Sequence, residues 1–534
     1  MVVAEFENLT GDPALAFLGI TAVDWFTEGI QRTGLVSGVA TETAVRASRF
    51  VRTTTGTEID PILLIAREAS AKIVVTGRFY RTRDSVQYQI QVHDVQPKRL
   101  VGAIGPFSSP LTDPIAGLAE ASTRLMGLLA TDVDRRLEQF VRQPLHPPTF
   151  DSYRDFSLGL DRYIASDFVA AATLFRGAFD GDTSFAAPAI FGSISLSNQG
   201  RYGEADSLLQ RLSSQRSRLS SFHRAWLDFR LALLAGNRPA ALRAVRALDE
   251  AEPRSKSAYN HALEALENGF VDEAITVLKN LSPDEGPMRG WIPYFEVLGA
   301  AHHLVQELTQ ELAIGNEARR RYPDRLYALL PTVRALAALG RNTELETLLQ
   351  GARRLPPDPY GTTIAHLLVE AGDELAAHGN RDRAVAFHRR AVAELASAGG
   401  LAKQPQLMLL ARAHRSLGDW TGLASTGRSL LELDTVAPDA RGVLGVGLAR
   451  LGRVTEARAL IDSLGEDRRP YLFGGPALNQ ARIAAALGQP AEAISYLQRA
   501  IAQGREYDLW IHRDHDFAAL RADSGFVGFA TPRR

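Results

Sequence analysis

The stretch Gly200-Arg-Tyr-Gly-Glu-Ala205 returns, little changed, as Gly269-Phe-Val-Asp-Glu-Ala274 and again as Gly452-Arg-Val-Thr-Glu-Ala457. In each copy a glycine ends an apolar stretch, and an alanine follows five residues later. Five more glycines have an Ala or Leu at the same distance: Gly236, Gly340, Gly379, Gly418 and Gly488. The gaps between successive glycines are 36, 33, 71, 39, 39, 34 and 36 residues, which predicts an α-solenoid of stacked repeats.

The gap of 71 residues is nearly two periods, so we place a missing repeat at His303 and an earlier one at Ser166. This gives ten turn residues, here called anchors, with spacings of 34, 36, 33, 34, 37, 39, 39, 34 and 36 residues. A glycine tolerates the tight turn between two helices, and a small residue five positions later lets the helices approach closely. Nine positions after the anchor, eight of the ten repeats have an apolar residue, with His388 and Gly427 as the exceptions. The residues five after the anchors are Ala171, Ala205, Ala241, Ala274, Leu308, Leu345, Ala384, Leu423, Ala457 and Ala493.

The first hundred residues have a different pattern. The run Val2–Phe6 indicates a buried strand, and apolar residues at helical spacing follow from Ala14 to Gln31. Between Val86 and Val92, apolar residues alternate strictly with glutamines, which is typical of a strand with one buried face. We expect Val101–Phe107 to pair with this strand across a turn at residues 94–98. A further strand is predicted at residues 35–39, a helix at 58–70 and a strand at 73–76.

These segments carry a family resemblance. The stretch Val3-Ala-Glu-Phe-Glu-Asn-Leu-Thr-Gly-Asp-Pro13, the stretch Lys72-Ile-Val-Val-Thr-Gly77 with Ala66-Arg-Glu-Ala before it, and the strand Gln87–Asp94 resemble the TolB-type amino-terminal domain of bacterial regulators. The resemblance covers about the first 110 residues and implies a small α/β domain, commonly followed by tetratricopeptide repeats. Such domains often lie behind a serine/threonine kinase or winged-helix domain, usually with a membrane helix between. This sequence begins on the first strand, so kinase activity is not carried over.

The predicted fold is therefore a small α/β domain followed by an all-α tetratricopeptide-type solenoid, a right-handed superhelix of helix-turn-helix repeats. The α/β domain covers residues 1–110, and a linking helix at 113–141 with a proline-rich linker covers 111–148. About ten repeats occupy 149–505. Residues 506–534 form a C-terminal cap, in which aromatic side chains seal the last apolar face. These side chains are Tyr507, Trp510, Phe517, Phe526 and Phe529.

Composition excludes several classes of site. The chain has no cysteine, which removes disulfides, thiolate metal ligands and cysteine nucleophiles. A formal net charge of −1 gives no general attraction to nucleic acid or to anionic membranes, so we expect no direct nucleic-acid binding. No apolar run reaches the roughly 20 residues of a membrane helix, and no signal peptide is evident. We expect a soluble, cytoplasmic chain with no membrane insertion, or an extracytoplasmic one if a membrane helix precedes it.

Catalytic motifs are incomplete. His512-Arg-Asp514 spells the tripeptide of the kinase catalytic loop, but Ala519 stands where that loop requires Asn. The neighbouring His512, Asp514, His515 and Asp516 offer metal-ligand chemistry, but we expect a solvated terminal turn instead. We find no phosphate-binding loop and no nucleophile elbow. The sequence therefore predicts a chain that is not an enzyme and binds no cofactor or metal.

One constellation suggests a binding surface. Six residues before the anchor, where the first helix of a repeat faces the concave groove, stand Arg230, Arg334, Arg412 and Arg482, with Asp373 as the single acid. Guanidinium groups in a groove suit carboxylate or phosphate capture. The alternative is surface arginine in a chain that is rich in arginine.

The predicted function is a non-catalytic scaffold or sensor of a bacterial signalling system, more specifically the sensor part of a serine/threonine kinase, which binds another protein or a peptide in the solenoid groove. The alternative is the partner-binding module of a transcriptional regulator whose DNA-binding domain is on another chain.

Overall fold

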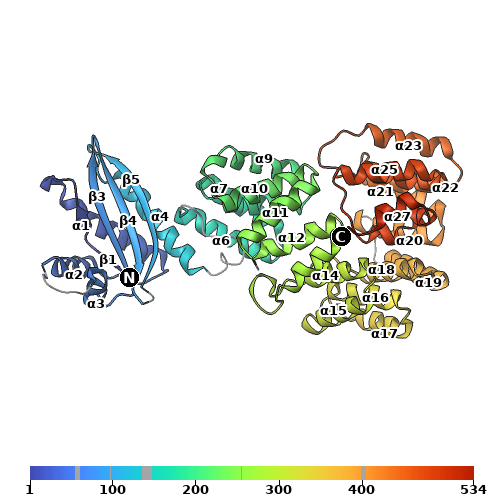
Figure 1. Cartoon of the computed structure of the whole chain (residues 1–534), viewed down its shortest axis with the longest axis horizontal. Helices are drawn as coiled ribbons and strands as arrows, with labels where there is room; N and C mark the ends of the chain where they lie inside the picture. The colour runs from blue at the N-terminus through green and yellow to red at the C-terminus, as the bar shows by residue number, and fades with distance from the viewer. Residues whose placement is uncertain (54–59, 97, 135–146, 254, 398–403, 534) are drawn as a thin grey trace. The chain divides into compact units, whose positions relative to one another are not determined.

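The computed structural model describes residues 1–53, 60–96, 98–134, 147–253, 255–397 and 404–533 (Figure 1). They form two compact units, Met1–Leu227 and Asp228–Arg534, and each unit is described by itself. The first unit contains the α/β domain and two helix pairs. The second unit begins within α10 (Ser221–Leu234) and contains the later pairs and the C-terminal segment.

The α/β domain is built on a five-stranded sheet of order β1-β3-β4-β5, with β2 also paired to β3. The short strands β1 (Val2–Val3) and β2 (Glu7–Asn8) run parallel to β3 (Ile73–Thr82). The long strands β3, β4 (Ser85–Asp94) and β5 (Arg99–Pro110) form an antiparallel ribbon. The predicted strand pairing across residues 94–98 is confirmed.

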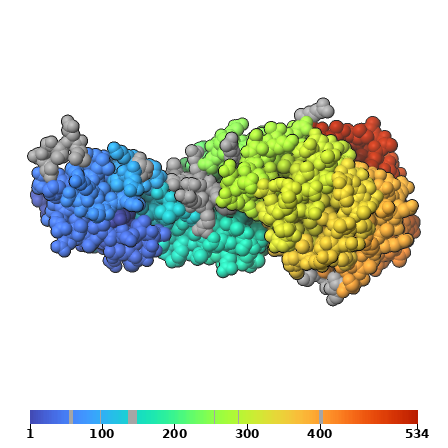
Figure 2. Space-filling model, turned by 90° about the horizontal axis from the view of Figure 1, so that it is seen from below, coloured from blue at the N-terminus to red at the C-terminus, as the bar shows by residue number. Residues whose placement is uncertain are grey.

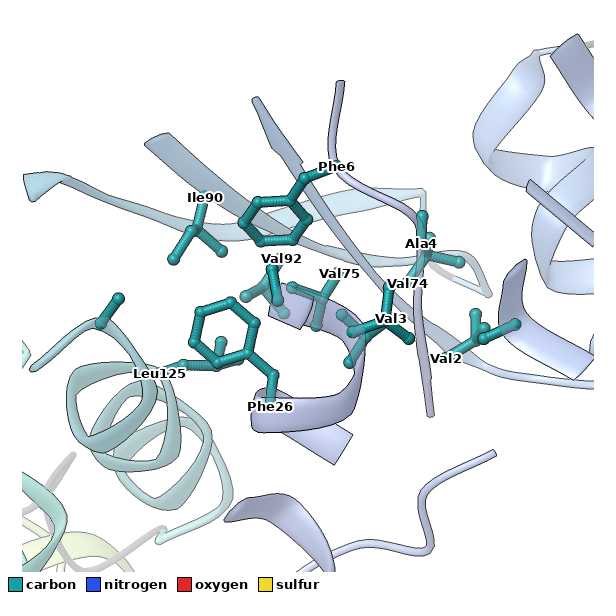
Figure 3. Close-up of a cluster of buried hydrophobic side chains, with 14 of the residues drawn as sticks. Val2, Val3, Ala4, Phe6, Phe26, Val74, Val75, Ile90, Val92 and Leu125 are labelled. Carbon is teal, nitrogen blue, oxygen red and sulfur yellow. The ribbon is translucent and has the colours of Figure 1, made fainter. Parts of the chain in front are cut away.

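One face of this sheet forms an apolar core (Figure 3). Every second residue of β4 is buried there, as the alternation predicted: Val86, Tyr88, Ile90 and Val92. Helices α1 (Phe17–Thr33) and α4 (Ala116–Val133) cover this face, and Figure 3 shows Phe26 and Leu125 pointing from them toward the strands. The ring of Phe6 occupies the space beside Gly77, where an added Cβ would lie 2.2 Å from the ring.

Two details differ from the expectation for this domain. Residues 35–39 form no strand; the segment meets the end of β1 through the Val39 N–H, which donates to the Met1 carbonyl, and the Met1 amino group, which donates to the Ser37 carbonyl. Helix α2 (Thr41–Thr53) follows and was not predicted. Helix α3 spans Pro61–Glu68, within the predicted 58–70, and part of that prediction lies outside the described residues, as does the end of the predicted linking helix.

The described part of the chain contains the ten predicted helix pairs. They are α6/α7 (Phe150–Ile164, Phe168–Gly181), α8/α9 (Ala186–Ser197, Tyr202–Ser213), α10/α11 (Ser221–Leu234, Arg238–Ala251), α12/α13 (Lys256–Glu267, Val271–Lys279), α14/α15 (Pro293–Leu304, Leu308–Arg321), α16/α17 (Leu330–Ala338, Asn342–Ala352), α18/α19 (Ile364–Ala377, Arg381–Ser397), α20/α21 (Gln404–Leu417, Trp420–Leu433), α22/α23 (Pro438–Arg450, Val454–Glu466) and α24/α25 (Gly475–Ala486, Pro490–Ala502). The chain thus has a tetratricopeptide-like helical solenoid. On the face seen in Figure 2, the atoms of the second unit, coloured green to red, are closely packed.

Nine of the ten predicted anchors sit at the turn within a pair and have a positive φ, between 61° at Ser166 and 84° at Gly269 and Gly379. This left-handed conformation favours glycine, which explains why eight of the anchors are glycines. The small residues five positions later are buried, as predicted; Ala205, Ala241 and Ala457 have no exposed surface.

The remaining predicted anchor, His303, lies three residues before the actual turn residue. His303 lies in the last turn of α14, and the left-handed turn residue is Gln306, with φ of 62°. The packing position five residues later is then Glu311, which is fully buried, and Leu308 is only half-buried. Nine residues after Gln306 stands Gly315, where an added Cβ would lie 2.4 Å from the Thr332 hydroxyl. The error arose because neither the turn nor the packing position keeps its usual residue type.

The second unit closes on itself. Gly504, which follows α25 in the sequence, lies against the turn at Gly236. An added Cβ on Gly504 would be 2.6 Å from the Gly236 Cα. Arg238 Nε donates to the Gly504 carbonyl at 3.3 Å. Further along, the Tyr507 N–H donates to the Glu267 carbonyl at 2.9 Å, and the chain end reaches α12 (Figure 1). The last helix pair of this unit therefore meets its first.

The C-terminal segment does more than cover the last repeat. Its elements are α26 (Trp510–Arg513), η5 (His515–Leu520) and α27 (Ser524–Ala530). They contact α18, α20, α24 and α25, and Tyr507, Trp510, Phe517 and Phe526 are buried. The expected solvated turn is wrong, because Asp516 is only 3% exposed.

Candidate anion-binding site

The predicted arginine stripe divides into three places in the second unit. Arg412 on α20 and Arg482 on α24 line one pocket. Arg334 on α16 lies apart from that pocket and is 1% exposed. Arg230 on α10 is also buried, and its charge acts on the buried Glu264. The structure therefore brings two of the four predicted residues together.

Arg334 contacts carboxylates of its own chain. Its Nε donates to Glu311 Oε1 at 2.9 Å, and its Nη1 donates to Glu296 Oε1 at 2.5 Å. Burial alone would lower the pKa of Arg334, but the two carboxylates outweigh it and raise the pKa. This arginine joins α14, α15 and α16 and is not exposed to a ligand.

Arg412 belongs to a second ionic group, centred on α18. It donates to Glu370 at 2.9 Å and to Asp373 at 3.0 Å, and Asp373 also lies 2.9 Å from His388 Nε2. Burial alone would raise the pKa of Asp373, but the charge of Arg412 and the hydrogen bond with His388 lower it. Arg513 from α26 donates to Glu370 and Glu374, so the C-terminal segment is tied to the same helix.

Most of these acids were not predicted. The predicted groove position lies six residues before each anchor, where Asp373 is the single carboxylate. Glu370 and Glu374 lie nine and five residues before Gly379, on the same side of α18 as Asp373 because three to four residues make one helical turn. This helical spacing is the sequence signal that places all three acids on one face. Nothing in the local sequence shows that the C-terminal segment supplies Arg513 and Asp514.

Five arginines and three aspartates line a cavity of about 220 Å³, here called the arginine pocket. Its residues are Asp373, Arg412, Arg415, Arg482, Arg505, Asp508, Trp510, Arg513, Asp514 and His515. Arg482 Nε donates to Asp514 at 2.9 Å. Among the described residues, Arg415 Nη2, Arg505 Nε and His515 Nε2 are buried without a hydrogen-bond partner. The lining therefore has an excess of positive charge and unused donors.

This arrangement can hold an anion. Guanidinium groups bind carboxylate and phosphate through paired, charge-assisted hydrogen bonds. The volume is below the roughly 300 Å³ at which small-molecule pockets begin, so it suits a single acidic side chain or a phosphate group.

Comparisons with known proteins define no family for this chain. No protein-family model and no curated protein matches its sequence. Similar solved structures include a human IFIT1 dimer with PPP-AAAA (14% identity, 68% of this chain and 79% of that one, TM-score 0.29). Others are a monomeric IFIT1 mutant with Gppp-AAAA (13%, 72% and 83%, 0.28) and the APC/C hetero-tetramer Cut9-Hcn1 (12%, 71% and 85%, 0.25). Superpositions this loose assign no function.

The class of protein is thus set by the chain's own helices: an α-helical repeat protein with an amino-terminal α/β domain. Among the described residues, no helix combines the length and the apolar character that crossing a bilayer requires.

Proposed function

We propose that this chain is a non-catalytic interaction scaffold that binds an acidic group of a partner protein or peptide in the arginine pocket. The observation that carries the proposal is the set of buried guanidinium and imidazole nitrogens without partners on the inner side of the second unit. A buried donor without a partner is costly, so an incoming carboxylate or phosphate gains the full strength of the new hydrogen bonds.

The biological setting that we propose comes from the amino-terminal domain. Its resemblance to the TolB-type domain supports a role in a bacterial signalling system, as the sensor part of a serine/threonine kinase. The helical array then presents the partner site, and the α/β domain supplies a second folded surface.

Arg505 and Arg415 are the residues to test. Arg334 and Arg412 hold carboxylates of this chain, so reversing their charge would disturb the fold as well as binding. Arg505→Gln removes an unpaired donor from the pocket. Arg415→Gln also removes one, but it breaks the buried ion pair of Arg415 with Asp516 at 3.2 Å as well, so the fold of this variant is checked by circular dichroism. Arg390→Gln is the matched control, because Arg390 forms a half-exposed pair with Glu346 and does not line the pocket.

The full-length wild-type chain and these variants are immobilised, and bound proteins from the source cells are compared by mass spectrometry. We expect a partner that is retained by wild type and by Arg390→Gln, and that is at least about 10-fold depleted on the two pocket variants. A labelled peptide of glutamates, with a glutamine peptide beside it, tests the charge directly by fluorescence anisotropy. Equal binding of the two peptides, equal capture by all variants, or turnover of any captured substrate would overturn the proposal.

A further inference from the structure

Three potential metal ligands meet where α14 ends against α18. Glu374 and His378 are four residues apart on α18, so they lie on one face, one helical turn from each other. His303 comes from the last turn of α14, 71 residues earlier in the sequence. One ligand atom of each residue lies within 4.8 Å of the others.

The distances are close to those of a bound zinc ion. His303 Nε2 lies 3.2 Å from Glu374 Oε2, and His378 Nε2 lies 3.8 Å from the same oxygen. Two ligand atoms that each lie about 2.1 Å from a tetrahedral zinc ion are about 3.4 Å apart. Small side-chain adjustments are enough to reach that geometry.

The surrounding residues orient the ligands. His303 Nδ1 lies 2.7 Å from Glu311 Oε2, which directs the other ring nitrogen toward Glu374. Metal-binding histidines are usually held in this way by a carboxylate on the nitrogen that does not face the metal. Arg513 donates to Glu374 Oε1 and leaves Oε2 for the cluster. Glu311 is an acid at the packing position where the other nine repeats have alanine or leucine.

Burial separates this cluster from an ordinary surface group of histidines. The side chains of His303 and Glu374 are 2% and 1% exposed, and that of His378 is 25% exposed. His378 thus lies where an ion can enter. Close by, His512 Nε2 is buried and has no hydrogen-bond partner among the described residues. This nitrogen could accept a hydrogen bond from a water molecule bound to the metal.

We propose that His303, Glu374 and His378 bind a divalent first-row transition metal, with zinc as the best fit, and that a fourth coordination position is open to water. Two imidazole nitrogens and one carboxylate oxygen are a donor set for zinc or for iron(II), whereas magnesium and calcium prefer oxygen ligands throughout. The sequence analysis expected no metal, because the three ligands have no recognisable spacing in the chain.

Zinc titration of the full-length, chelator-treated protein tests this site by calorimetry. We expect one zinc ion per chain for wild type, and His378→Asn should bind it at least about 100-fold more weakly, because one of three ligands is lost. His366→Asn is the matched control. His366 stands on the same helix, four residues from Glu370 and 3.6 Å from its Oε1, but outside the cluster.

Two readouts keep the result independent of variant folding. Cobalt(II) added to the wild-type chain should give visible d–d bands of a site with nitrogen ligands, and excess zinc should abolish them. Zinc should also raise the melting temperature of wild type and of His366→Asn, but not of His378→Asn. A protonated His303 shared between Glu311 and Glu374 explains the same contacts without a metal. Absence of zinc binding to wild type, or equal binding by His378→Asn, would establish that reading and overturn the proposal.

Discussion

The helix pairs α22/α23 and α14/α15 are both helix-turn-helix repeats, but they differ in the residues at the turn and at the packing positions. In α22/α23 the turn residue is Gly452, the packing residue is Ala457, and Ile461 follows on the same face; both packing residues are buried and apolar. In α14/α15 the corresponding residues are Gln306, Glu311 and Gly315. The second pair thus replaces a small apolar contact by a buried carboxylate that binds Arg334 and His303.

In a repeat protein, positions that depart from the repeated residue type are candidates for a functional role. A repeat position that abandons its usual residue type loses packing, so some other interaction must stabilise it. Here Glu311 joins the ionic group of Arg334 and the histidine of the proposed metal site. His388 makes the same point in α18/α19, because it takes the place of the usual apolar residue and contacts Asp373. Glu311 and His388 thus both contact buried charged or titratable groups of the second unit, here called its charged inner part.

The largest effect is expected from Glu311→Ala, which restores the residue that most repeats have at this position. Arg334 and His303 would each lose a buried partner, and breaking a buried ion pair costs about 3–5 kcal/mol of unfolding free energy. Urea unfolding followed by circular dichroism measures the loss. Ala457→Glu is the reciprocal change and should also destabilise, because it buries a new carboxylate. A Glu311→Ala chain as stable as wild type would show that the α14/α15 pair does not depend on its carboxylate.

The charged inner part should also give the second unit a pH dependence that an apolar repeat core lacks. Burial raises the pKa of Asp516 to about 6, Arg415 opposes the shift and Asp514 adds to it. Because the folded state binds this proton more tightly than the unfolded state, the stability that Asp516 contributes is complete below about pH 4 and is lost as the pH rises through 6. The expected loss is about 3 kcal/mol.

Unfolding free energies measured between pH 4.5 and 7 test this dependence. Asp516→Asn should lower the slope without abolishing it, because burial also raises the pKa of Glu267, to about 8, in the same unit. Asp132→Asn should leave it unchanged, because Asp132 pairs with the half-exposed Arg99 of the α/β domain. A slope of the same size in Asp516→Asn and wild type would show that Asp516 does not contribute to the dependence.

A smaller effect is expected at the turn of the pair that follows the rule. Gly452 has φ of 76°, and no atom lies within 4 Å of an added Cβ. Gly452→Ala therefore causes no clash and should cost only the left-handed backbone strain of about 1–2 kcal/mol. Thermal unfolding measures the shift. A larger loss would contradict the open space around Gly452.

The smallest effect is expected from Gln306→Gly, the reverse exchange in α14/α15. Relief of the strain at φ of 62° is partly offset by the greater flexibility of glycine in the unfolded chain, so we expect a gain of about 0.5 kcal/mol. A rise in melting temperature measures it. A loss instead would show that the Gln306 side chain, whose amide donates to the His303 carbonyl, contributes more than the turn costs.

The repeat array was predictable because the residues that determine the packing of each pair lie close together in the sequence. The turn glycine, the small residue and the apolar residue lie within ten positions of one another, and nine of ten turns were placed correctly. The strand β4 was predictable for the same reason, since period two shows which face is buried. Gln306 was not, because the polar residues of that pair give no glycine or alanine signal.

The candidate sites were predictable only in part. The rule of six residues before the anchor found Arg412 and Arg482, which do share a pocket. It also selected Arg334, which the structure buries between two carboxylates, and it overlooked Arg415 and Arg505. The three residues of the metal cluster were not associated at all, because His303 and Glu374 come from different repeats.

Local sequence patterns were sufficient to predict the ten-pair array, the sheet with one buried face and the presence of arginines on the inner helices. The closure of the second unit and the charge pairs inside it follow only from the folded arrangement. The cause is the separation of the contacting residues along the chain. Helix packing repeats every 33–39 residues, whereas Arg513 and Glu370 are 143 residues apart, and Arg238 and Gly504 are 266 apart. No local pattern records contacts of that separation, because they depend on the summed curvature of all the repeats between them.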